Sequence, residues 1–138
     1  MPVRIVTDSS SDLDTAVVEE LGVEVVPLSI RFGSDEFTDR VELTVEDFYT
    51  RMASSSALPE TAAPSVGAFE QAFRRQAEAG ADAVVCITIS SKLSATMQAA
   101  ENAAKAVADD LPVKVVDSLS VTAGLGTIVQ LAAQAAAD

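Results

Sequence analysis

The chain has 138 residues, and its 9 basic against 21 acidic side chains give a formal net charge of −12. It has no His and a single Cys, which excludes Ser-His-Asp catalysis, the HExxH zinc site and an intramolecular disulfide. Nucleic acid is an unfavourable partner at this charge, because phosphate binding needs a dense set of Lys and Arg side chains. No apolar stretch approaches the ~20 residues of a membrane span, and the N-terminus turns polar too early for a signal peptide, so we expect a soluble, cytoplasmic protein.

The hydrophobic pattern predicts strands that alternate with helices along the chain. Expected strands are the runs 3–7, 23–32, 83–89 and 113–116, with Pro27 interrupting the second run, and a short edge strand at 37–41. Expected helices follow Leu13, Thr44, Ser65, Leu93 and Ser120. This order predicts an α/β fold, namely a mostly parallel sheet with helices on both faces.

Local signals set some of the predicted boundaries. Two pairs stand in capping-box register, Ser11 with Asp14 and Thr44 with Asp47, while Gly22 marks a helix end. The segment 54–65 has no hydrophobic period and is predicted to be a loop. It exceeds the usual length of a connection in a compact domain, so both a functional and a disordered role are open.

Clusters of Ser, Thr and Asp follow three of the predicted strands, at 7–11, 90–96 and 117–120. The carboxyl ends of parallel strands lie along one edge of a sheet, where ligands usually bind, so we expect these clusters to converge. Hydroxyls and the N–H groups of helix ends together form an uncharged site for a carboxylate or phosphate. The same residue types are also ordinary helix N-caps, so capping alone remains an alternative for each cluster.

Two other patterns do not indicate a binding site. Asp8, Asp12 and Asp14 match no EF-hand spacing and lie at a predicted helix start, so no metal is expected. Gly124 and Gly126 lack the third glycine of a dinucleotide fingerprint, and we interpret them as small residues that permit close packing.

Several motifs also occur in a specific order along the chain. They are VRIVTDSSSDL at 3–13, VPL at 26–28, DFY at 47–49, PETAAPS at 59–65, ISSKLSAT at 89–96, VDS at 116–118 and GLG at 124–126. In this order the motifs resemble the DegV family of fatty-acid-binding proteins. The resemblance spans essentially the whole chain. It implies that residues 1–138 form a single α/β domain, the N-terminal half of a two-domain lipid-binding protein.

The resemblance implies a carrier and not an enzyme. Members of this family hold one long-chain fatty acid between two domains, and some present it to a separate fatty acid kinase. No cofactor is expected, since the fatty acid itself is the ligand. By motif position, the ligands expected for the carboxylate are Thr61 and Ser94, supported by Ser91, Ser65, Ser9 and Ser118. Hydroxyls without a nearby Arg would leave that carboxylate reachable for a kinase.

The chain departs from the family pattern at some positions. Ala62 and Ala63 stand where the family usually has Ser and Gln, Ala95 where it has Gly, and Met97 where it has an aromatic residue. Two alternatives stay open: a doubly wound enzyme that acts on a small phosphorylated or carboxylated substrate, and a structural or interaction domain in which the polar clusters are only caps. An isolated half would leave an apolar face uncovered, so self-association is a further hypothesis.

Overall fold

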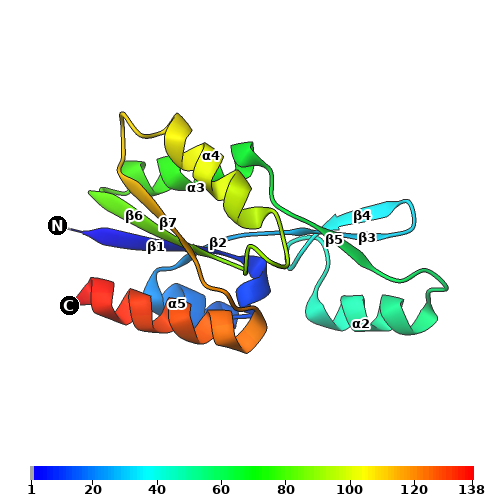
Figure 1. The fold of residues 1–138 in the computed structure, drawn as a ribbon. Helices are drawn as coiled ribbons and strands as arrows, with labels where there is room; N and C mark the ends of the chain where they lie inside the picture. The colour runs from blue at the N-terminus through cyan, green and yellow to red at the C-terminus, as the bar shows by residue number, and fades with distance from the viewer. Residues whose placement is uncertain (1) are drawn as a thin grey trace.

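A four-stranded parallel sheet forms the centre of the computed structural model, which describes residues 2–138 (Figure 1). Its strands, in the order β2-β1-β6-β7, are β2 (Glu24–Val26), β1 (Val3–Asp8), β6 (Ala83–Thr88) and β7 (Val113–Asp117). The uninterrupted apolar run of β6 suits a strand that is covered on both faces. The predicted parallel sheet is confirmed.

Helices cover both faces of this sheet, as predicted (Figure 1). On one face lie α3 (Val66–Glu78) and α4 (Thr96–Ala106), and their core includes the fully buried Phe69 and Phe73. On the other face lie α1 (Thr15–Leu21) and α5 (Thr122–Ala137), where Leu125 and Val129 are fully buried. Among residues 2–138, no helix is long and apolar enough to cross a bilayer.

A second, antiparallel sheet was not predicted from the sequence. It has the order β4-β3-β5 and consists of β4 (Asp35–Thr38), β3 (Ser29–Phe32) and β5 (Glu60–Ala62), with α2 (Val45–Ser54) beside it. Ile30, Phe32 and Leu43 form its small core. In Figure 1 this sheet and α2 lie beyond the carboxyl ends of the parallel strands.

Several predicted boundaries are corrected by this sheet. The run 23–32, expected as one interrupted strand, is divided at Pro27 into β2 and β3, which belong to different sheets. The edge strand expected at 37–41 is β4, which ends at Thr38 because the chain turns there: the Glu42 amide donates to the Thr38 carbonyl at 2.9 Å. The segment 54–65 contains β5 and is not wholly a loop.

Two of the predicted helix caps are confirmed, and two of the predicted helix starts are wrong. The Thr44 hydroxyl accepts the Asp47 amide at 3.1 Å, which confirms the cap of α2, and Gly22 caps α1 with a φ of 63°. The Ser11–Asp14 box is wrong, since Ser11 lies in the short 3₁₀ helix η1 (Ser9–Ser11) and Asp14 itself is the N-cap of α1. The helix expected from Leu93 begins only at Thr96.

The glycines of α5 pack closely, as expected. A Cβ atom at Gly126 would lie 2.6 Å from the backbone oxygen of Ser11, so only glycine lets α5 approach η1 this closely. This contact fixes η1 at the carboxyl edge of the parallel sheet.

Candidate functional site

The buried Asp8 ends strand β1 and organises the carboxyl edge of the sheet. One of its carboxylate oxygens accepts the Ile89 amide at 2.8 Å, and the other accepts both the amide, at 2.9 Å, and the hydroxyl of Ser10. Burial raises the pKa of Asp8 above its ordinary value, although these hydrogen bonds oppose that shift. Asp8 therefore holds β1, η1 and the end of β6 in one arrangement.

The three polar clusters meet at this edge, as the sequence predicted. The Ser118 amide donates to the Thr88 carbonyl at 3.2 Å, and the Ser90 amide donates to the Ser120 carbonyl at 2.8 Å. Part of their hydrogen-bonding capacity is used within the protein, because the side chains of these segments bond to one another and to backbone groups.

A cavity of about 560 Å³ lies between η1 on one side and α2 with the antiparallel sheet on the other. Its apolar wall is formed by residues of the chain after β2, of β3 and of α2, namely Leu28, Ile30, Val45, Phe48 and Tyr49. Its polar wall is formed by residues of η1, β5, the start of α5 and the turns nearby, namely Ser9, Ser10, Asp12, Asp39, Arg40, Thr61 and Thr122. The cavity is therefore amphipathic, with hydroxyl and charged groups facing an apolar surface.

Two of the predicted ligand residues lie on this cavity. Thr61 is exposed on β5, where it pairs with Ile30 of β3. Ser9 is buried, and its hydroxyl accepts the Leu28 amide at 2.9 Å, which ties η1 to the start of the antiparallel sheet. The structure thus brings Thr61 and Ser9 to one space.

The other four predicted residues are not among the described residues that line the cavity. Ser94 lies 2.8 Å from the Thr96 hydroxyl and accepts the Thr96 amide at 3.2 Å, while Ser65 caps α3. Ser118 accepts the Ser120 amide at 3.1 Å.

Ser91 has a partner of its own. Its hydroxyl donates to the carboxylate of Asp117. This bond is the largest cause of the lowered pKa of Asp117. All four residues thus have local structural partners, and their role as ligands stays a prediction.

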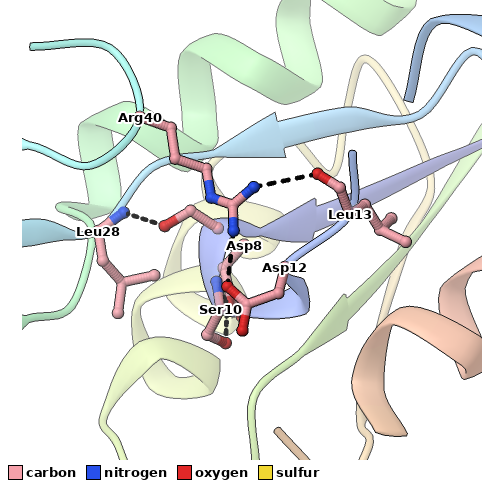
Figure 2. A network of polar contacts seen from close by, with 7 residues as sticks. Asp8, Ser10, Asp12, Leu13, Leu28 and Arg40 are labelled. Atoms are coloured by element: carbon pink, nitrogen blue, oxygen red, sulfur yellow. Dashed lines mark hydrogen bonds and ion pairs between the residues drawn. The ribbon is translucent and has the colours of Figure 1, made fainter. Parts of the chain in front are cut away.

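Arg40 is a cavity residue that the sequence did not single out. Figure 2 shows its guanidinium pointing toward Asp12, where Nη2 donates to Oδ1 at 2.8 Å, and toward the Leu13 carbonyl, which accepts from Nη1 at 3.2 Å. The expectation of a site without a nearby Arg is therefore wrong for this cavity, since Arg40 shares its wall with Thr61. No local motif could have revealed this, because the contact joins residues 28 positions apart.

Metal binding has no support in the described part of the chain. Across residues 2–138, no three His, Cys, Asp or Glu side chains gather closely enough to hold an ion. The arrangement suits an organic ligand that has one anionic or polar end and an apolar body.

Comparison with known proteins places the chain among relatives of one kind. A family model described as "Uncharacterised protein, DegV family" matches residues 2–138. A DegV domain-containing protein of Halalkalibacterium halodurans is 43% identical over 105 residues, which is 76% of this chain and 37% of that protein. The chain spans less than half the length of the curated relatives that it matches first, with 37%, 47% and 35% of their residues covered.

Solved structures agree with the sequence matches. A fatty-acid-binding DegV family protein from Thermus thermophilus superposes with a TM-score of 0.87 at 36% identity, over 97% of this chain and 47% of that one. A stearic-acid-binding protein from Eubacterium ventriosum gives a TM-score of 0.89 at 32% identity, over 96% of this chain and 46% of that one.

Proposed function

Because this chain belongs to the DegV family, we propose that it binds one long-chain fatty acid in the cavity between α2 and η1. Two structural relatives above 30% identity are described as proteins that bind fatty acid. Both are longer than this chain, so their ligand is carried over as a proposal. The observation that carries the proposal is the amphipathic cavity itself.

The size and lining of the cavity suit a lipid. Its volume of about 560 Å³ falls within the ~300–1,000 Å³ of typical ligand pockets. On α2, Val45, Tyr49 and Met52 share one face of the helix and remain 48%, 59% and 41% exposed. An acyl chain laid against α2 would remove this apolar surface from water, which is favourable by roughly 25 cal/mol per Å².

The carboxylate end of the ligand is proposed to meet hydroxyl groups. Thr61 is the first candidate, because its exposed side chain faces the cavity and a hydroxyl can donate to a carboxylate oxygen. Ser94 is the second candidate, on its motif position. It would have to exchange its contact with Thr96 for the ligand. Ser9, Ser65, Ser91 and Ser118 would support these two from the same edge of the sheet.

We assign the chain a carrier role, with chemistry left to a separate fatty acid kinase. Hydroxyl groups hold a carboxylate without altering it, and the chain has no His to serve as a general base. A carboxylate at the polar wall would lie beside the exposed Thr61 and so remain within reach of another protein.

The test is to extract the gently purified chain with organic solvent and to identify the lipid by mass spectrometry. We expect one long-chain fatty acid per chain. Val45→Asp places a charge on the apolar wall at the start of α2, where an acidic residue suits the helix, and should lower the occupancy strongly. Val41→Asp is the matched control, since Val41 is 74% exposed and lies outside the cavity lining. Repeated preparations of the unaltered protein without fatty acid would overturn the proposal.

A further inference from the structure

Arg40 is the one basic side chain among the described residues that line the cavity. The same lining includes two acidic side chains, Asp12 and Asp39, in a chain whose net charge is −12. An anionic ligand that enters this space meets a repulsive field except at the guanidinium. Charge recognition in the cavity therefore depends on Arg40.

The backbone holds Arg40 and Asp12 in an unusual conformation. Both residues adopt left-handed φ values, 61° for Arg40 and 51° for Asp12, which non-glycine residues rarely do. The Arg40 turn is closed by its own amide, which donates to the Leu43 carbonyl at 3.0 Å. Asp12 caps η1, and its amide donates to the Ser9 carbonyl. Two turns from different parts of the chain, each with a left-handed residue, thus bring the opposite charges of Arg40 and Asp12 together.

The Arg40–Asp12 pair is accessible enough to be exchanged. The side chain of Arg40 is 32% exposed and that of Asp12 is 48% exposed. Both charges would therefore remain hydrated if the pair separated. Exposed pairs of this kind contribute little to stability. The guanidinium also carries a planar fork of donors that matches a carboxylate in a bidentate manner.

We propose that Arg40 recognises the acid group of the ligand and that Asp12 is the internal carboxylate that occupies Arg40 when the cavity is empty. This inference rests on the proposed function, because it assumes that a fatty acid enters the cavity. The carboxylate of the ligand displaces Asp12 into solvent and takes its place on the guanidinium, with Thr61 on the same wall as a neutral donor. Asp12 thereby competes with the ligand and sets how tightly the acid group is held.

The test measures binding of cis-parinaric acid, a fluorescent fatty acid, and of its methyl ester to the full chain. Arg40→Gln should weaken binding of the acid about tenfold or more and leave binding of the ester unchanged, because only the acid carries a charge. Arg40→Lys should lie in between, since it keeps the charge and loses the fork. Asp12→Asn should strengthen binding of the acid.

Arg31→Gln is the matched control, because Arg31 is an exposed arginine of β3 that pairs with Glu60 outside this cavity. If Arg40 only shaped the loop, Arg40→Gln would weaken binding of acid and ester alike, which would overturn the inference. Equal binding of the acid by the Arg40→Gln and Arg31→Gln proteins would also overturn it and leave fatty-acid binding intact. If the unaltered chain binds neither probe, the proposed function fails together with the inference.

Discussion

The carboxylate of Asp8 accepts the amide hydrogen of Ile89 at 2.8 Å, although 81 positions separate the two residues in the chain. The bond lies just beyond the last ladder pair of the two strands, Thr7 with Ile87, and both partners are buried. It therefore continues the β1–β6 connection by a side chain at the point where the backbone ladder ends. The loops on either side carry the polar groups of the candidate site.

Replacing Asp8 by Ala should destabilise the fold by about 3 kcal/mol, because the buried amide of Ile89 and the partly buried amide of Ser10 would lose their acceptor. The measurement is urea unfolding followed by circular dichroism. Asp14→Ala is the control, since Asp14 is exposed and its side chain makes no capping bond to α1, so its effect should stay within ~0.5 kcal/mol. Similar losses in both variants would contradict this account of Asp8.

The stability that Asp8 contributes should depend on pH. Burial raises the pKa of Asp8 above 3.8, so the folded protein holds this proton more tightly than the unfolded chain does. The part of the stability that comes from protonation of Asp8 is fully present below pH 3.8 and is lost as the pH rises through the folded pKa. The free energy of unfolding of the unaltered protein, minus that of Asp8→Asn, should therefore fall with rising pH across this interval. A series of urea titrations measures it, and a rising difference would refute the prediction.

Gly126→Ala should cost about 2 kcal/mol, because the new methyl group would press on the backbone oxygen of Ser11 and force α5 away from η1. Gly124→Ala is a matched comparison two residues earlier in the same helix. There the methyl group would meet mainly the hydroxyl of Ser120, which can rotate away, and alanine favours a helix by about 1 kcal/mol over glycine. In thermal unfolding, the melting temperature of Gly124→Ala should equal or exceed that of the unaltered protein. A smaller loss for Gly126→Ala than for Gly124→Ala would contradict the packing argument.

Thr61→Ala should weaken retention of fatty acid severalfold without loss of stability, since Thr61 is exposed and faces the cavity. Ser94→Ala should weaken retention too, and it should also lower the melting temperature, because Ser94 accepts the Thr96 amide at the start of α4. Lipid occupancy is measured by mass spectrometry, with Thr127→Ala as the control on the exposed side of α5. Unchanged occupancy in both Thr61→Ala and Ser94→Ala would reject the two as ligands.

The parallel core was predictable because its signals are local. The apolar run of β6 and the cap of α1 at Gly22 each fix an element from a few neighbouring residues. The antiparallel sheet lacked such signals. Strand β5 is short and fully exposed, with no alternation of polar and apolar residues, and its register with β3 comes only from tertiary pairing.

The candidate site also has one part that could be predicted from the sequence and one part that could not. Convergence of the Ser and Thr clusters follows from the rule for parallel strands, so Ser9 and the segment after β6 were expected at one edge. Arg40 and Asp12 belong to turns whose left-handed backbone leaves no pattern in the sequence. The Ser11–Asp14 register met the rule for a capping box, but burial of Ser11 beneath α5 prevailed over it.

The division at Pro27 separates the chain into two structural units, each with its own sheet. Residues 29–62 form an insertion between β2 and α3, with a small core of their own in Ile30, Phe32 and Leu43. Such a unit can open while the parallel core stays folded, because local opening requires far less free energy than global unfolding. The cavity is lined by residues of both units. For the proposed fatty acid, we therefore expect the rate of exchange to follow loosening of residues 29–62 and not the stability of the whole protein.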